Sequence, residues 1–112
     1  MDAREFDERA SVMLARIEAL LEGCEAEAMD YEIRPGGVIE IEFDHAGGSQ
    51  IIINRHAAAQ EIWLAARSGG FHFRPDPEQA GRWVGTRDGA ELLDVLARCM
   101  SEQAGTQIVF EP

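Results

Sequence analysis

Apolar residues recur at spacings of three and four over residues 4–24, which is the period of an amphipathic α-helix. The apolar stripe comprises Phe6, Ala10, Met13, Leu14, Ile17, Leu20, Leu21 and Cys24. One flank of this stripe is acidic and carries Asp7, Glu18, Glu22 and Glu25. Gly23 falls where the pattern stops, so we expect the helix to end there.

A strictly alternating segment predicts a half-buried strand over residues 38–44, after a proline–glycine turn signal at residues 35–37. One face of this strand carries Ile39, Ile41 and Phe43, and the other carries Glu40, Glu42 and Asp44. Further short strands separated by turn residues are expected at residues 50–55, 61–67, 71–74 and 82–86. The alanines within residues 61–67 leave that segment ambiguous with a helix. The segment before the turn, EAEAMD at residues 25–30, is expected to be an acidic connection.

A second amphipathic helix is predicted near the end of the chain. Asp88 is its expected N-cap, and Glu91, three residues later, completes a capping-box pattern. Its apolar stripe comprises Leu92, Leu93, Leu96, Cys99 and Met100. Gly105 is expected to end the helix.

The order of these elements is helix, several strands, helix. Turns of hairpin length exclude parallel crossovers, so the strands should form an antiparallel sheet. Two helices with one apolar stripe each can cover one face of that sheet. The predicted fold is therefore an α+β two-layer sandwich, one domain over residues 1–112, whose other sheet face has no helix to cover it.

The net charge of the chain indicates which classes of partner it can bind. Ten basic residues, all of them arginine, stand against 21 acidic residues, which gives a formal net charge of −11. Such a charge repels nucleic acid and anionic lipid, so neither is an expected partner. It attracts cations and basic protein surfaces.

Two further features bear on location. No apolar run approaches the roughly 20 residues that a membrane-spanning helix needs, and the acidic start lacks the features of a signal peptide. We therefore expect a cytoplasmic protein. Cys24 and Cys99 are then expected to be reduced thiols that serve packing.

The acidic residues are the first candidate site. Hard cations such as iron, calcium or magnesium require several oxygen ligands, which a row of carboxylates can supply. The candidate set is Glu18, Glu22, Glu25, Glu27, Asp30, Glu40, Glu42 and Asp44. Neither an EF-hand loop nor a Glu-x-x-His pair accompanies this set, so a bound metal should be exposed and weakly held. The same pattern is also typical of a solvated, solubilising face, and the residues alone leave both interpretations open.

Trp63 is the second candidate. It falls between Ile62 and Leu64 in its predicted strand, so it takes the face opposite to theirs. If the aliphatic side chains face the helices, Trp63 lies on the uncovered sheet face, which Asn54 also reaches. A tryptophan exposed among polar groups is a candidate anchor for a protein partner. The alternative is a tryptophan half-buried under its neighbours.

An ordered set of short motifs runs over essentially the whole chain. The motifs are IIINR (51–55), IWLA (62–65), SGGFHF (68–73), Arg82-Trp83, TRDG (86–89) and QAGT (103–106), with Glu5-Phe6 near the start. In this order and spacing they resemble the frataxin family, in its bacterial, CyaY-type branch.

The resemblance implies two helices on one face of an antiparallel sheet, and no conventional active site. It implies weak, reversible binding of ferrous or ferric iron on an acidic ridge, where other divalent cations can compete. It also implies a regulatory part in iron–sulfur cluster assembly, through binding to the complex of cysteine desulfurase and scaffold protein. A monomer is expected, which iron can drive into oligomers.

Residue by residue, the family's ridge positions are occupied here by Glu18, Glu22, Glu25, Glu27 and Asp30. Ala19 and Gly23 stand where bacterial relatives often carry acids, so the ridge is thinner at these positions. Glu40 and Glu42 partly offset that loss.

The family's partner surface on the sheet is matched by Asn54 and Trp63, and Arg55 and His72 are assigned to the same surface. His56 and Glu61 both stand where a glutamine is usual. These two departures change the chemistry that the surface offers, although not its position.

Two other functions compete with the regulator. One is an iron oxidase that uses clustered carboxylates, against which the acids here alternate on exposed positions. The other is an acidic interaction module without a metal role.

Overall fold

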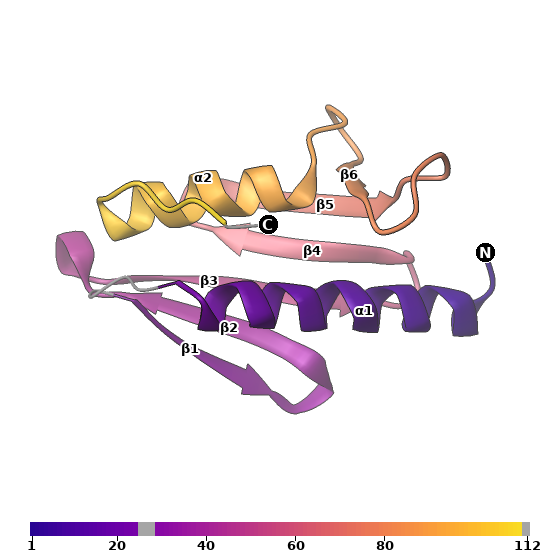
Figure 1. The fold of residues 1–112 in the computed structure, drawn as a ribbon, viewed down its shortest axis with the longest axis horizontal. Coiled ribbons are helices and arrows are strands. Elements are labelled where there is room, and N and C mark those ends of the chain that lie inside the picture. Colours follow the sequence, from indigo (N-terminus) through magenta and orange to yellow (C-terminus); the bar gives the residue numbers. More distant parts are fainter. Residues whose placement is uncertain (25–28, 111–112) are drawn as a thin grey trace.

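The computed structural model describes residues 1–24 and 29–110, which form two layers (Figure 1). The helices are α1 (Ala3–Glu22) and α2 (Leu92–Ala104). The strands are β1 (Met29–Arg34), β2 (Val38–Phe43), β3 (Ser49–His56), β4 (Glu61–Ala66), β5 (Gly69–Pro75) and β6 (Trp83–Gly85). Among these described residues, neither helix has the length and apolar character that crossing a membrane requires.

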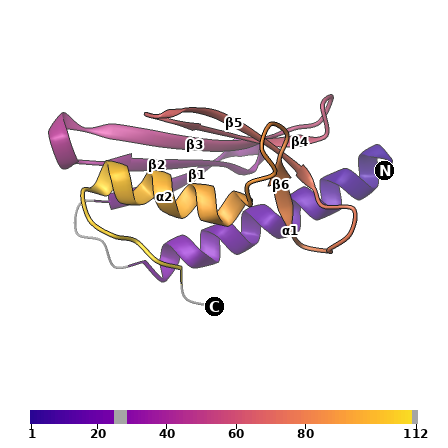
Figure 2. The same cartoon turned by 90° about the horizontal axis from the view of Figure 1, so that it is seen from above.

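The sheet is a meander in the order β1-β2-β3-β4-β5-β6, and every neighbouring pair is antiparallel. Both helices lie on the same side of it, as Figure 2 shows from above. The predicted α+β sandwich is therefore confirmed. The core lies between the layers, where the inward rows of the strands, such as Ile39 and Ile41, meet the apolar stripes of the helices.

Strand β1 was not predicted. The expectation that residues 25–30 form an acidic connection was wrong for Met29 and Asp30, while residues 25–28 lie outside the described part of the chain. Tyr31 pairs with Ile41 and Ile33 with Ile39 in the antiparallel register. Because β1 is the edge of the sheet, its inward side chains are only partly covered, and Ile33 is 43% exposed. The segment MDYEIR in fact alternates strictly between apolar and polar residues, which is the pattern of a half-buried strand, so the sequence carried a signal for β1 that the assignment of residues 25–30 to a connection missed.

The start of α2 also differs from the prediction. Its N-cap is Glu91, whose carboxylate accepts hydrogen bonds from the backbone N–H groups of Leu93 (2.9 Å) and Asp94 (3.2 Å). Asp88 instead accepts a bond from the N–H of Ala90 (3.0 Å), within the preceding turn. Gly89 lies between them at φ 73°, a left-handed conformation that an α-helix cannot contain. The helix therefore begins later than predicted.

Gln103 joins α2 to the sheet. Its side chain is 2% exposed, and its Nε2 donates to the hydroxyl of Ser49 (2.9 Å) and to the carbonyl oxygen of Gln50 (3.1 Å). Its Oε1 accepts from the backbone N–H of Arg67 (3.0 Å). This amide thus satisfies polar groups at the end of the sheet that the helix would otherwise bury unpaired.

We predict that Gln103→Leu destabilises the fold, because it removes all three hydrogen bonds and leaves buried polar groups unsatisfied. The expected loss is roughly 1–3 kcal/mol in the free energy of unfolding, measured by urea denaturation. The matched control is Glu102→Leu on the exposed side of the same turn, which removes only a surface ion pair with Arg98 and should change stability little. Equal losses in the two variants would contradict this role for Gln103.

Candidate functional site

The uncovered face of the sheet carries the candidate partner residues. Strands alternate, so the residues between the buried aliphatic side chains must point away from the helices. Trp63 of β4 lies there, directly opposite Asn54 of β3 and His72 of β5 in the register of the sheet. The structure therefore brings these three predicted residues into one row across three strands.

Trp63 is stacked between two imidazoles. Its ring centroid lies 4.0 Å from that of His56 and 4.3 Å from that of His72, and the planes differ by only 8° and 7°. The three rings form a parallel stack across β3, β4 and β5, which we call the His–Trp–His stack. Packing on both faces of the indole restricts its conformation before any partner binds.

Glu61 fixes the edge of this stack. It is 6% exposed, and its Oε1 accepts a hydrogen bond from the indole N–H of Trp63 (2.8 Å) and lies 3.4 Å from Nδ1 of His72. Its Oε2 accepts from the guanidinium of Arg74 (3.0 Å). Burial by itself raises the pKa of Glu61, but the hydrogen bonds from Trp63 and Arg74 and the nearby charges bring that pKa below its usual value. The carboxylate is thus ionised and holds the indole in place.

His56, Glu61 and Arg74 were not predicted as members of this site. His56 and Glu61 were noticed only as departures from the glutamines usual in frataxins. The alternation of residues along β5 could have indicated Arg74, because it places Arg74 on the same face of the sheet as His72. The ring contacts themselves depend on the register between strands, which no single strand reveals.

Arg55 lies on the other face. It continues the inward row of Ile51 and Ile53, and its Nη1 donates to the carbonyl oxygen of Asp7 (3.2 Å) and to the hydroxyl of Ser11 (3.0 Å). It also forms an ion pair with the carboxylate of Asp7. Arg55 therefore ties β3 to α1 and does not share a surface with the other residues assigned to partner binding.

The eight acids of the candidate metal set do not form one group. Glu18 and Glu22 are exposed on α1, on the flank that faces β1. Partial burial raises the pKa of the Tyr31 hydroxyl on β1, and the charges of Glu22 and Glu18 raise it further. Glu25 and Glu27 lie outside the described residues.

The strand acids lie on the uncovered face instead. In the register of the sheet, Asp30 is opposite Glu42 and Glu32 is opposite Glu40. Arg34 partly neutralises the second pair, with contacts of 3.0 Å to Glu40 and 3.2 Å to Glu32. The last acid of the set, at position 44, is exposed just beyond the end of β2. We call the helix acids and the strand acids together the acidic edge.

This distribution decides what the acidic edge can bind. Within residues 1–24 and 29–110, no three His, Cys, Asp or Glu side chains lie close enough to hold one metal ion together. A hard cation would therefore meet one or two carboxylates at a time and keep most of its water. The carboxylates fit loose, exchangeable binding of a hard ion, at several places along the edge.

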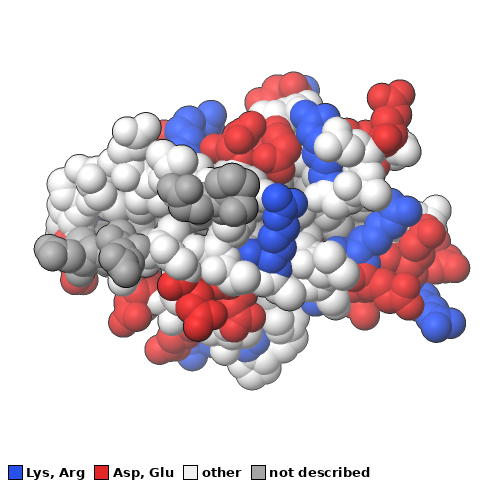
Figure 3. Space-filling model, in the orientation of Figure 1, with Lys and Arg blue, Asp and Glu red and all other residues white. Residues whose placement is uncertain are grey.

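Figure 3 shows the helix-covered side of the molecule. Acidic side chains gather along the lower edge of the view, at its right-hand end and along its top, and arginines lie among them. The acids of β1 and β2 lie on the other face of the sheet. The excess of negative charge attracts cations and basic surfaces.

Comparison with known proteins places this arrangement among relatives. A sequence model described as the frataxin-like domain matches residues 1–106. The iron-sulfur cluster assembly protein CyaY of Dechloromonas aromatica is 54% identical over 110 residues, which cover 98% of this chain and 99% of the relative. The CyaY protein of Cupriavidus taiwanensis is 50% identical over 109 residues, covering 95% and 93%. The solved structure of frataxin from Psychromonas ingrahamii superimposes with a TM-score of 0.83 at 26% identity, with full coverage of both chains.

The two tryptophans allow a matched test of the site. Trp83 is 2% exposed and packs edge-to-face on Phe6 with centroids 6.0 Å apart, whereas Trp63 lies on the uncovered face. We predict that Trp83→Ala costs roughly 3–5 kcal/mol of unfolding free energy, as large-to-small core changes do. Trp63→Ala should cost much less and leave the far-ultraviolet circular dichroism spectrum unchanged. If Trp63→Ala unfolds the protein, Trp63 belongs to the core and the docking interpretation is wrong.

Proposed function

Because the chain belongs to the frataxin family, we propose that it regulates iron–sulfur cluster assembly without catalysing a reaction. In this proposal it docks on the complex of cysteine desulfurase and scaffold protein, and it binds iron loosely and reversibly. Its two cysteines, Cys24 and Cys99, are free thiols, which suits work in the reducing cytoplasm. The docking form is a monomer.

The observation that carries the docking part is the His–Trp–His stack, which lies on the sheet face opposite to α1 and α2. An aromatic side chain that is held rigid and partly exposed loses little conformational freedom on binding, so it suits an anchor. Around it lie hydrogen-bonding groups, including Asn54, and the exposed guanidinium of Arg74. These groups can fix the orientation of a partner that buries the indole.

The acidic edge supports the second part of the proposal. Its carboxylates are hard oxygen ligands, and their exposure suits exchange of a cation with the surroundings. The same negative field would accelerate encounter with a basic patch on the desulfurase. One surface thus serves both iron binding and steering.

The metal part predicts weak binding at several places. Titration with ferrous iron, observed by broadening of amide NMR signals, should affect the region of Glu18 and Glu22 together with β1 and β2, without saturating at one ion. Magnesium or calcium in excess should compete, since they seek the same hard ligands. The double variant Glu18→Gln/Glu22→Gln should lose the broadening on α1, and Asp94→Asn on α2 should not.

Two results would contradict this. One tight site that survives the loss of Glu18 and Glu22 would place iron elsewhere. Iron-dependent oxygen consumption that disappears in the same double variant would favour the iron oxidase.

The docking part predicts that two classes of variant behave differently. Glu18→Lys with Glu22→Lys should slow association with the desulfurase–scaffold complex and weaken its dependence on salt, because steering is electrostatic. Trp63→Ala should instead speed dissociation by about thirtyfold, the equivalent of the roughly 2 kcal/mol that a buried aromatic anchor contributes. Binding kinetics at two ionic strengths measure both effects.

The matched control for these kinetics is Arg98→Gln, an exposed change on α2 on the other side of the molecule, which should alter neither rate. Unchanged dissociation for a folded Trp63→Ala protein would remove the stack from the interface.

A further inference from the structure

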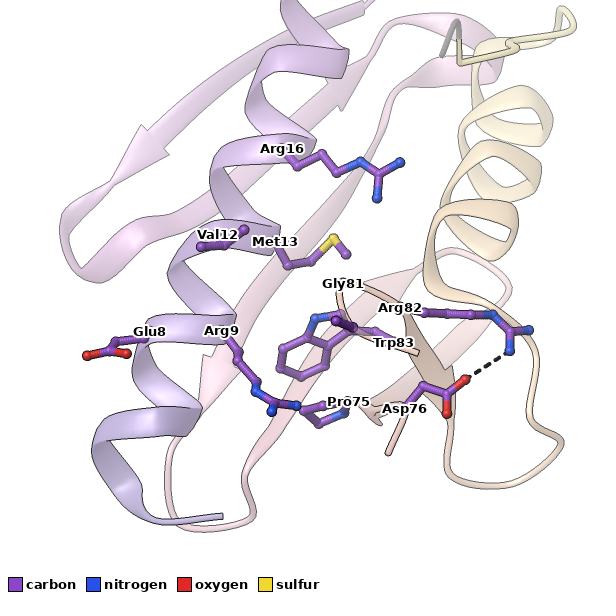
Figure 4. A pocket seen from close by; sticks show the side chains of 11 residues that line it. Glu8, Arg9, Val12, Met13, Arg16, Pro75, Asp76, Gly81, Arg82 and Trp83 are labelled. Atoms are coloured by element: carbon purple, nitrogen blue, oxygen red, sulfur yellow. Dashed lines mark hydrogen bonds and ion pairs between the residues drawn. The ribbon is translucent and has the colours of Figure 1, made fainter. Parts of the chain in front are cut away.

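On the helix-covered side, α1 and the segment that joins β5 to β6 enclose a hollow of about 370 Å³ (Figure 4). Cavities of this size accept small organic ligands. The hollow opens on the flank of α1 that faces β6, whereas Glu18 and Glu22 face β1. It is separate from the His–Trp–His stack, which lies on the opposite face of the sheet.

The hollow has an apolar floor and rim. Met13 and Trp83, each 2% exposed, close its base, and Pro75 forms part of the wall. Val12 stands at the rim with 68% of its surface exposed, although it is a large apolar residue on an otherwise polar part of the helix. The body of an apolar ligand could cover this valine and displace water from the floor.

Arginines surround the apolar part. Arg9 and Arg16 stand two helical turns apart on α1, on the same stripe as the rim and floor residues, and Arg82 comes from the strand side. Three guanidinium groups around one hollow are unexpected in a chain with a net charge of −11. They outnumber the two acids, Glu8 and Asp76, that also line the hollow.

The acidic side chains near the hollow already form ion pairs or hydrogen bonds with other residues. Asp76 forms an ion pair with Arg82 (3.0 Å) and accepts the backbone N–H of Glu78 (2.9 Å). The Glu78 bond and then the Arg82 contacts outweigh the effect of burial and lower the pKa of Asp76, so this acid stays ionised. Glu8 pairs with Arg4 (3.2 Å).

Two of the three arginines are left available. Arg9 has one distant contact, 3.8 Å to Glu5. Arg16 forms no ion pair or side-chain hydrogen bond within the part of the chain that the structure describes. Guanidinium groups bind carboxylates with two parallel hydrogen bonds, which makes them selective for that group.

We propose that this hollow binds a small organic carboxylate with an apolar body. The carboxylate binds the guanidinium group of Arg16 at one end of the hollow, and the apolar body rests on Val12, Met13 and Trp83. A cation is disfavoured by the arginines, and a neutral apolar molecule would leave them without a partner. This site is independent of the docking and iron-binding functions proposed above.

The test compares three small molecules, each of which carries an apolar body, a carboxylate or both. Phenylbutyrate carries the body and the charge, phenylbutanamide carries the body alone, and acetate carries the charge alone. Titration of the full chain, observed by NMR, should give saturable shifts of the Val12 and Met13 amides and of the Trp83 indole N–H with phenylbutyrate. Phenylbutanamide should bind at least about tenfold more weakly, since it lacks the charge-assisted hydrogen bonds. Acetate should not saturate.

Variants locate the site. Arg16→Gln is an exposed change that should preserve the fold and weaken phenylbutyrate binding at least about tenfold. Val12→Glu places a carboxylate at the rim and should also weaken binding, whereas Arg98→Gln on α2 is the matched arginine control and should not. Equal affinity for the acid and the amide, unchanged binding in Arg16→Gln, or no saturable shifts at these residues would each overturn the proposal.

Discussion

The structure depends on one constraint, which is that both helices cover the same face of an antiparallel meander. In every strand, alternate residues then face the helices, and we call them the dry row. The residues between them point away from the helices, and we call these the wet row. The dry rows, with members such as Ile41 and Leu64, meet the helices and form the core. The wet rows do not contact the helices, so side chains there, such as Trp63 and Glu42, can be selected for what they bind.

Charge is the second consequence of that division. The molecule concentrates like charges on β1 and β2, where Asp30 faces Glu42 and Glu32 faces Glu40. Cross-strand pairs of like charge are destabilising, so this arrangement has a cost that folding alone does not explain. Arg34 offsets part of this cost through its contacts with Glu32 and Glu40. The proposed binding of cations at these carboxylates would offset such repulsion.

Sequence patterns predicted the elements whose burial is one-sided and strong. The alternation around Ile41 located β2, and the stripe that contains Ile17 located α1. Strand β1 was missed although residues 29–34 alternate strictly, because the acidic residues before them favoured a connecting segment over residues 25–30. The start of α2 was placed too early, because Gly89 interrupts the segment before Glu91 can cap the helix. At the candidate site, strand alternation predicted that Trp63 lies on the face away from the helices. The stacking of two histidines on Trp63 could not be predicted, because ring contacts arise from the pairing between strands.

The exposed edge strand has a consequence for self-association. A sheet that ends in an unpaired strand offers its backbone hydrogen-bonding groups to a second copy, and charged side chains are a common means of preventing that pairing. In β1 the charged side chains that can provide this protection are those of Asp30, Glu32 and Arg34, whereas Ile33 on the same strand is exposed and apolar. These two carboxylates stand beside Glu40 and Glu42, among the groups that a cation would seek. An ion that neutralised this face would therefore also weaken the repulsion between two copies, so the proposed cation binding and the proposed monomeric state depend on the same charges.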